Sequence, residues 1–311
     1  MTLDLPPTSS SNLWRPQRSL SKNMERLVKI VFGGFAFISV ATTLGIVLTL
    51  IFETIEFFQE VPLWNFLTDT KWTPLFSSAE FGIMVLISAT LMVSAIAILV
   101  ALPIGLMAAI YLSEYAKPQA RTWLKPALEI LAGVPSIVFG YFALLTVTPF
   151  LQLFIPGLQG FNGLSAGLVL GISIIPLVAS LSEDAIYSVP RSLRDGAYAL
   201  GATKREVIVN VVLPAALSGI VASFIIAISR AIGETMIVTL AAGQNPRLGF
   251  NPGVPVMAMT AFIVQVSLGD TPAGSLAYKT IFAVGMTLFL MTLVLNIFSF
   301  WFVRRFREKY E

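Results

Sequence analysis

The stretch "DGAYALGATKREVIVNVVLP", residues Asp195 to Pro214, separates two long apolar runs and contains the turn and capping signals on which the fold depends. Apolar residues at helical spacing lead into it and predict a short amphipathic helix. These residues are Val189, Leu193, Ala197 and Leu200. Gly201 is expected to end or bend this helix, because glycine tolerates the backbone turn found at many helix C-termini.

A second helix is expected directly after this turn. Thr203 and Glu206 are three residues apart, which is the spacing of a capping box. Pro214 follows near the start of the next apolar run, where the first turn of a helix tolerates proline. The segment therefore predicts a short helix, a sharp turn and a second helix that enters the apolar run.

Composition places most of the chain in a membrane. Of 311 residues, 56% are hydrophobic and 12% are charged, whereas a soluble domain has about 25% charged residues. The mean hydropathy is +0.83. The sequence has no cysteine and no histidine, which excludes disulfides, thiol chemistry and histidine as a metal ligand or general base. It also has no G-x-x-x-x-G-K-[ST] motif, so it lacks a phosphate-binding loop for ATP hydrolysis of its own.

Six apolar runs are long enough for membrane spans, which need about 20 residues each. The run Ile130 to Ser182 is uncharged and too long for one helix, and the turn-rich segment "FIPGLQGFNG" (Phe154 to Gly163) divides it. The expected spans cover residues 30–52, 81–113, the two halves of 130–182, 207–242 and 281–302. The segment Met257 to Val266 is apolar but too short to cross, and a short outer helix is expected there.

The charges indicate an orientation. Of twenty lysines and arginines, sixteen lie in the two tails and in the loops between spans 2 and 3 and between spans 4 and 5. Because positive residues are retained in the cytoplasm, both termini of this multi-pass cell-membrane protein are predicted to be cytoplasmic. On the other side, four aromatic residues are expected to be anchors at the outer interface: Trp64, Trp72, Phe76 and Phe81.

The sequence "ISRAIGETM", Ile228 to Met236, places Arg230 and Glu234 inside span 5. An intramembrane charge costs about 3 kcal/mol or more and is a functional hypothesis by default. Four residues apart, the two side chains should share one helix face, with Ser229 and Thr235 beside them. The planar fork of arginine matches an oxyanion such as phosphate or sulfate. The alternative is an ion pair that only joins helices.

The short helix after span 4 has two interpretations, an interfacial helix on lipid headgroups or a docking site for a soluble partner. Its sequence resembles the signature loop of binding-protein-dependent ABC importer permeases: Glu-Ala-Ala, three residues, Gly, nine residues, an aliphatic residue, any residue, Leu-Pro. Asp195 and Gly196 depart mildly from that pattern, and the spacing is complete. In that family the loop is a coupling helix in a groove of the ATP-hydrolysing subunit. The resemblance implies these coupling residues: Asp195, Gly196, Ala197, Leu200, Gly201, Leu213 and Pro214.

Two further motifs resemble those of oxyanion permeases. "SRAIGETM" is similar to their span-5 motif, and Thr235 after the glutamate is typical of phosphate members, whereas sulfate and molybdate members tend to have Phe-Gly. "LAGVPSIVFGYFAL", Leu131 to Leu144, is similar to the third-span motif of phosphate permeases. There, a glycine and a proline either loosen a helix near the path or only assist packing. The implied substrate-path residues are Ser136, Ser229, Arg230, Glu234 and Thr235.

The resemblance implies an importer in which this chain, as the C-type rather than the A-type permease, assembles with three partners in membrane lipid. They are a second related permease, a dimer of ATP-binding subunits that hold ATP and magnesium, and an extracytoplasmic phosphate-binding protein. No catalytic residue, metal, cofactor or nucleic acid is expected for this chain itself. The alternatives are a permease for another oxyanion, a passive channel, and an intramembrane enzyme, which would need paired catalytic groups in facing spans.

The sequence therefore predicts an all-α membrane protein of six transmembrane helices with a cytoplasmic coupling helix, in the MetI-like fold of type I ABC importer permeases. Four segments are expected. Residues 1–29 form a polar cytoplasmic tail, residues 30–78 the first span and an external loop, residues 79–304 the permease domain, and residues 305–311 the C-terminal tail.

Overall fold

A computed structural model describes residues 18–76 and 78–306 of the chain. The distal parts of the two predicted polar tails, residues 1–17 and 307–311, lie outside these ranges. The chain divides into two compact units, residues 1–52 and 53–311. In its described part the first unit consists of helix α1 (Arg18–Glu60), which continues into the second unit.

From Ile30 to Phe52 the helix of the first unit is uncharged and largely apolar on all sides. No residue from Met24 to Phe52 is buried within the protein. A long helix of this kind satisfies its backbone internally and places its side chains in lipid. It is therefore suited to be the first membrane span, as the sequence predicts.

The described part of the second unit is helical throughout, apart from loops and an isolated bridge between Trp72 and Phe81. The remaining α-helices are α2 (Leu63–Thr68), α3 (Met84–Ile110), α4 (Pro118–Gly133), α5 (Ser136–Phe142), α6 (Thr148–Gln152), α7 (Gly163–Tyr187), α8 (Arg191–Ala199), α9 (Lys204–Val207), α10 (Leu213–Ile232), α11 (Met236–Ala241), α12 (Met259–Leu268) and α13 (Leu276–Phe306). Three π-helical turns join some of them: η1 (Tyr111–Tyr115), η2 (Ala143–Val147) and η3 (Ile208–Val212).

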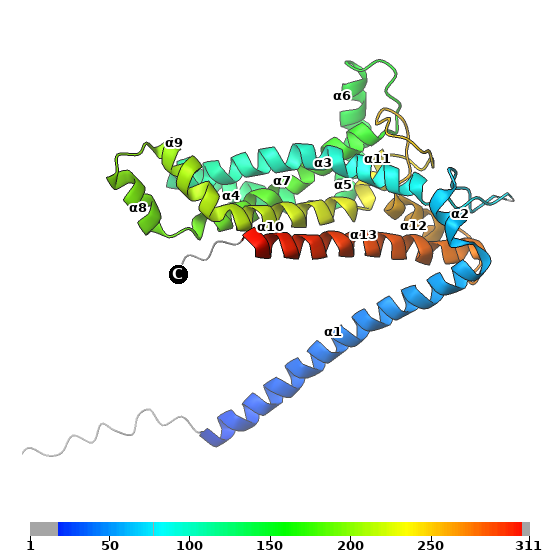
Figure 1. The fold of residues 1–311 in the computed structure, drawn as a ribbon, viewed down its shortest axis with the longest axis horizontal. Helices are drawn as coiled ribbons and strands as arrows, with labels where there is room; N and C mark the ends of the chain where they lie inside the picture. The colour runs from blue at the N-terminus through cyan, green and yellow to red at the C-terminus, as the bar shows by residue number, and fades with distance from the viewer. Residues whose placement is uncertain (1–17, 77, 307–311) are drawn as a thin grey trace, which may run out of the picture. The chain divides into compact units, whose positions relative to one another are not determined.

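Long helices of the second unit run alongside one another (Figure 1), with α8 and α9 at one end and α2, α6 and α12 toward the other. In the described residues, five helices are long and apolar enough to cross a membrane. The pair α4 and α5–α6, bent by 89°, gives a sixth span if it is counted as one. The expected all-α fold of six spans is therefore confirmed, with the third span sharply broken at the Gly-Val-Pro sequence.

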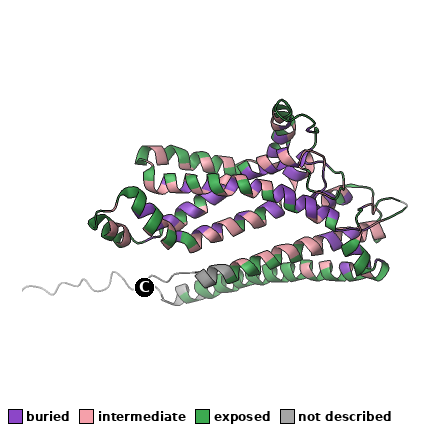
Figure 2. Cartoon of the chain, turned by 45° about the horizontal axis from the view of Figure 1, so that its top comes forward, coloured by how far each residue is buried: buried purple, intermediate pink, exposed green. Residues whose placement is uncertain are grey.

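The core of the second unit is centred on α3 and α7. Buried residues are concentrated in these central helices, and exposed residues cover the outward faces (Figure 2). Small residues allow the close approach, as is common between membrane helices. A Cβ atom added to Gly105 would lie 2.6 Å from the Cβ of Val178, and one added to Gly171 would lie 2.8 Å from the carbonyl oxygen of Ala97.

Replacing Gly171 with valine is expected to destabilise the helix pair. The added atoms would meet the backbone of α3, and overpacking of this kind costs about 1–3 kcal/mol. Thermal unfolding of the purified protein in detergent should show a lower midpoint than the native chain. Gly45→Ala in α1 is the matched control, since its Cβ has no neighbour within 4 Å. An unchanged midpoint for Gly171→Val would contradict the proposed packing.

Two expectations about particular residues are wrong. Span 5 was expected to extend to about Ala242, but α10 ends at Ile232, and the short helix α11 follows a three-residue break. Trp72 and Phe81 were expected to be interface anchors, but they are only 1% and 8% exposed. The cause is a cluster of phenylalanines at this end of the unit, against which both rings pack edge to face.

Candidate functional site

The turn after α8 has the geometry that its sequence predicts. Gly201 has a φ of +83°, a left-handed conformation that favours glycine. Its N–H donates to the carbonyl of Tyr198 at 2.9 Å, and the N–H of Ala202 donates to that of Ala197 at 3.2 Å. This pair of bonds satisfies the last carbonyls of the helix. Gly201 therefore ends α8, as expected.

The second helix begins with the predicted capping box. The backbone N–H of Thr203 donates to Oε2 of Glu206 at 2.8 Å, and the N–H of Glu206 donates to Oγ1 of Thr203 at 3.4 Å. The helix then passes through the π-helical turn η3 into α10, of which Pro214 is the second residue. Because proline lacks an N–H and clashes with the preceding turn of an α-helix, the wider η3 turn accommodates it without breaking the span.

The surface of α8 divides into a packed side and an exposed side. Leu193 and Ala197 pack against a cluster of buried aliphatic residues, and Leu213 joins them. Leu200 was expected on the same face, but its side chain is 90% exposed. The backbone leaves the helical path at this residue, with φ −83° and ψ 4°, so Leu200 points away from Leu193 and Ala197. Asp195 and Gly196 are also exposed.

Two contacts that the sequence did not predict fix α8 to the bundle. Arg194 lies 3.2 Å from Oε1 of Glu114, at the end of the α3–η1 segment. Its Nη2 also donates to the carbonyl of Ile186 in α7 at 2.8 Å. Side chains of Arg194 and Glu114 are 18% and 9% exposed, respectively. Such largely buried pairs are only weakly screened by salt, so α8 is held to both η1 and α7.

Arg230 and Glu234 do not share a helix face, contrary to expectation. Gly233 caps α10 and Glu234 lies in the break before α11. No ion pair within 4.0 Å joins the two residues among those that the structure describes. Arg230 is exposed in the isolated chain, and Glu234 is half-buried. The alternative of a buried pair that only joins helices therefore has no support here.

Glu234 instead satisfies the backbone at the start of α11. Its Oε1 accepts from the N–H groups of Met236 and Ile237, at 3.2 and 3.4 Å, and Thr260 donates to its carbonyl oxygen at 2.8 Å. A carboxylate is favourable at a helix N-terminus. Its second oxygen, Oε2, has no hydrogen-bond partner among the described residues. The carboxylate is thereby fixed in place with one acceptor oxygen available.

The other predicted substrate-path residues lie near the breaks between α4 and α5 and between α10 and α11. Ser229 donates to Oδ1 of Asn296 in α13 at 3.2 Å, and the hydroxyl of Thr235 donates to the carbonyl of Gly233 at 3.3 Å. Ser136 is half-buried at the first residue of α5. No hydrogen bond between described residues joins any of these three to Arg230. The α5 and α11 segments pack together, since a Cβ added to Gly140 would lie 3.1 Å from the carbonyl oxygen of Met236.

Arg230 lines a cavity of about 220 Å³ between α4, α7 and α10. The sequence did not predict this grouping, because its members come from segments more than forty residues apart. Besides Arg230, the polar lining residues are Lys125, Glu129, Ser173, Ser180 and Glu183. Three apolar residues and a proline complete the wall: Leu128, Ala132, Leu177 and Pro176. The cavity thus combines two cations, two carboxylates and two hydroxyl groups.

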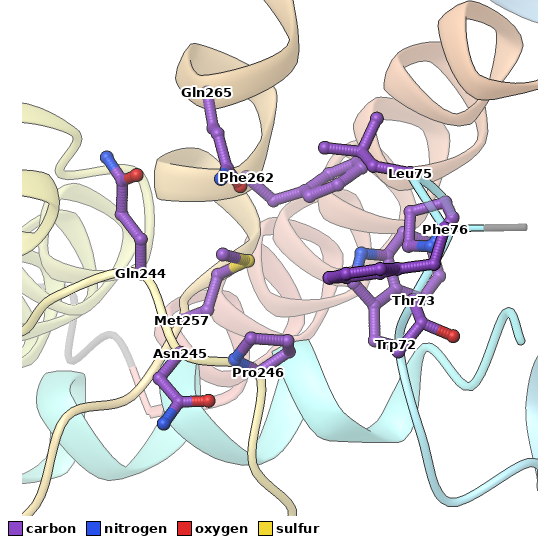
Figure 3. A pocket seen from close by; sticks show the side chains of 11 residues that line it. Trp72, Thr73, Leu75, Phe76, Gln244, Asn245, Pro246, Met257, Phe262 and Gln265 are labelled. Carbon is purple, nitrogen blue, oxygen red and sulfur yellow. The ribbon is translucent and has the colours of Figure 1, made fainter. Parts of the chain in front are cut away.

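A second cavity, of about 280 Å³, lies at the opposite end of the second unit from α8. Figure 3 shows Trp72 and Phe76 on one side of it, and Met257, Phe262 and Gln265 on another. Its lining is mostly apolar, and Nε1 of Trp72 is buried without a hydrogen-bond partner in the described residues. This cavity has no charged lining residue, so it offers an oxyanion no cationic partner.

These features define a helical membrane transport protein, with interrupted spans beside a charged cavity and a fixed helix at one end of the bundle. Residues 101–310 match the family of binding-protein-dependent transport system inner membrane components. The chain belongs to this family. It is therefore a multi-pass membrane permease of an ABC importer, a class that is not itself enzymatic.

Curated relatives and solved structures agree with this assignment. The chain is 35% identical over 254 residues to the phosphate transport system permease protein PstC of Mesorhizobium japonicum, covering 75% of this chain and 76% of that one. It is 33% identical over 228 residues to a probable ABC transporter permease protein, YqgH, of Bacillus subtilis, covering 73% and 74%.

Two solved transporters have the same fold. A chain of a bacterial ABC transporter involved in alginate import matches with a TM-score of 0.65 at 14% identity, over 93% of this chain and 100% of that one. A chain of the MetNI methionine ABC transporter, in an inward-facing conformation, matches with a TM-score of 0.54 at 18% identity, over 73% and 95%. At these identities the likeness concerns the fold alone, and it confirms the expected MetI-like architecture.

Proposed function

We propose that this chain is the C-type permease of an ATP-driven phosphate importer in the cell membrane, with both termini in the cytoplasm. The observation that carries the proposal is the exposure of Arg230 within a membrane span. At 1.5 Å per residue, it lies about 25 Å along the helix from Leu213. An arginine that faces lipid within a span costs about 3 kcal/mol or more. This face of α10 therefore faces a substrate path or a second subunit.

The choice of phosphate rests on chemistry and on relatives. The guanidinium fork can bind two oxygens of a tetrahedral oxyanion. Oε2 of Glu234, held two residues beyond the end of α10, can accept a hydrogen bond from hydrogen phosphate, whereas sulfate has no proton to donate at neutral pH. Relatives named as phosphate permeases, among them PstC of Mesorhizobium japonicum, support the same substrate.

The exposed side of α8 is proposed as the docking surface for the ATP-binding subunits. Asp195, Gly196 and Leu200 present this surface, while Ala197 and Gly201 fix the shape of the helix and its turn. Leu213 and Pro214 connect it to α10 through η3. The complete importer would add a second, PstA-like permease, a PstB-like ATPase dimer that binds ATP and magnesium, and an external PstS-like phosphate-binding protein.

Reconstitution with these partners tests the proposal. Phosphate is expected to stimulate ATP hydrolysis and to be taken up in preference to sulfate or molybdate. Glu234→Gln keeps an acceptor oxygen for the cap of α11 but replaces the other oxygen with an N–H donor. It should lower the ratio of phosphate to sulfate uptake roughly tenfold to a hundredfold, since a hydrogen bond to a charged group is worth about 1.5–3 kcal/mol.

Uptake of arsenate, which has the same protonation chemistry, provides the matched substrate control and should fall with that of phosphate. Stimulation by sulfate or molybdate but not by phosphate would show that the chain serves another oxyanion. An unchanged uptake ratio in Glu234→Gln would remove this carboxylate from substrate selection.

A further inference from the structure

The cavity between α4, α7 and α10 extends from Arg230 toward the end of the bundle where α8 lies. Ser173, Ser180 and Glu183 line it from successive turns of α7, and their spacing of seven and three residues places them on one face of that helix. From Ser173 to Glu183 the helix rises about 15 Å. The cavity therefore provides a polar strip that continues beyond the proposed arginine site.

Glu183 is the fixed charge in this cavity. Its side chain is 1% exposed and has two cationic partners from α4. Arg121 contacts its Oε1 directly, and Nζ of Lys125 lies 3.5 Å from its Oε2. A good N–H···O hydrogen bond is about 2.7–3.2 Å long. Lys125 is consequently the looser of the two partners, and it is the one that lines the cavity.

Arg121 adds one positive charge beside the cavity. Among the lining residues, Lys125 and Arg230 balance Glu129 and Glu183, and Arg121, which contacts Glu183 but does not line the cavity, gives the cluster an excess of one cation. Glu129 is exposed and has no ion pair within 4.0 Å among the described residues, although it is one turn from Lys125. In a cavity with low-dielectric walls, such a surplus attracts an anion.

Because Arg121 also contacts Glu183, Lys125 can exchange this carboxylate for an anion at a low cost in free energy. If an anion binds Lys125, Glu183 still keeps its contact with the guanidinium of Arg121. No carboxylate is then left buried and unpaired, which is the step that makes breaking a buried ion pair costly. When Lys125 returns to Glu183, the anion is displaced. The arrangement suits a group that binds an anion briefly and then releases it.

We propose that this cavity is the release site for the transported oxyanion, with Lys125 as its cationic ligand and Glu183 as the internal competitor that displaces it. The hydroxyl of Ser180, which is exposed on the cavity wall, is placed to donate to the same anion. The site accepts a tetrahedral oxyanion that is passed on from Arg230. The identification of this oxyanion as phosphate rests on the proposed function.

The sequence has no cysteine, so one introduced thiol reports on the cavity. Ser180→Cys is placed in the complete transporter, in inverted membrane vesicles that expose the cytoplasmic side, and labelled with small anionic or cationic thiosulfonates. The anionic reagent should react faster. Inorganic phosphate at ten times its dissociation constant should slow labelling about tenfold, because the occupied fraction is protected.

Variants in the Ser180→Cys background identify the ligand. Lys125→Gln should remove the protection by phosphate, and Lys125→Arg should keep it. Lys117→Gln is the matched control, because Lys117 precedes the same helix, is exposed and does not line the cavity. Ser188→Cys, just beyond α7 and outside the cavity, should label equally well with and without phosphate. Co-purification of the partners verifies assembly of each variant.

Three results would overturn the proposal: an unreactive thiol at Ser180→Cys, labelling that no oxyanion slows, or protection that survives in Lys125→Gln. If phosphate uptake is normal while no oxyanion protects, the release site is wrong and the proposed function stands. Protection by sulfate alone, in a transporter that takes up no phosphate, would instead show that the site is right and the substrate is wrong.

Discussion

Arg230→Ala is expected to lower phosphate uptake by the reconstituted transporter roughly a hundredfold or more, because two charge-assisted hydrogen bonds, each worth about 1.5–3 kcal/mol, would be lost. Arg230→Lys should retain part of the activity, since an ammonium keeps the charge but not the planar fork. The initial rate of uptake in proteoliposomes, normalised to the amount of assembled complex, measures both effects.

The control for this experiment is Arg26→Ala, an exposed arginine of α1 outside the second unit. Its loss should leave uptake unchanged. Normal transport by both Arg230 variants would demote this residue to a structural role and would remove the main support for an oxyanion path along α10.

Gly201→Val should prevent the chain from recruiting its ATP-binding subunits and abolish uptake, while insertion into the membrane is unaffected. The φ of Gly201 is +83°, and a left-handed conformation costs an ordinary residue about 1–2 kcal/mol. A β-branched side chain is even less compatible with it. The turn is therefore expected to rearrange and to displace the neighbouring Leu200 from the docking surface. Co-purification of the ATPase with the permease measures the effect.

Gly157→Val provides the matched control. Gly157 has a φ of +87° and its Cβ would meet no atom within 4 Å, but it lies in the turn between α6 and α7, at the other end of the bundle. The Gly157→Val substitution introduces a similar backbone strain and should leave recruitment of the ATP-binding subunits intact. Leu200→Asp changes the surface without straining the backbone and should also weaken recruitment. Undiminished recruitment in both Gly201→Val and Leu200→Asp would contradict the docking surface.

The local structure of the α8–α9 segment was predicted well from adjacent residues, and the predictions that failed have local causes. Gly201 and the Thr203–Glu206 capping box occur where the sequence places them, since both depend on a few adjacent residues. Leu200 was assigned to the wrong side of the helix because helical periodicity does not apply at a residue where the helix ends. The expectation that Arg230 and Glu234 share a helix face was wrong for a similar reason, because Gly233 ends α10 between them.

The charged cavity could not be predicted from adjacent residues. Lys125, Glu183 and Arg230 come from three helices that are distant in sequence, and only their packing brings them together. In the sequence, Lys125 is one of the basic residues between spans 2 and 3, and Glu183 directly follows the uncharged run that ends at Ser182. A buried carboxylate with two cationic partners depends on tertiary contacts, which no spacing within one segment encodes.

The attachment of α8 by Arg194 has a mechanical consequence. Nη2 of Arg194 binds the carbonyl of Ile186, and Ile186 is three residues, less than one helical turn, beyond Glu183. Under the proposed function, a displacement of α8 by the ATP-binding subunits would be transmitted through this hydrogen bond to the turn of α7 that carries the Glu183 carboxylate. The movement of α8 and the carboxylate that displaces the anion would then be linked through one arginine, so that ATP hydrolysis and release of the cargo occur together.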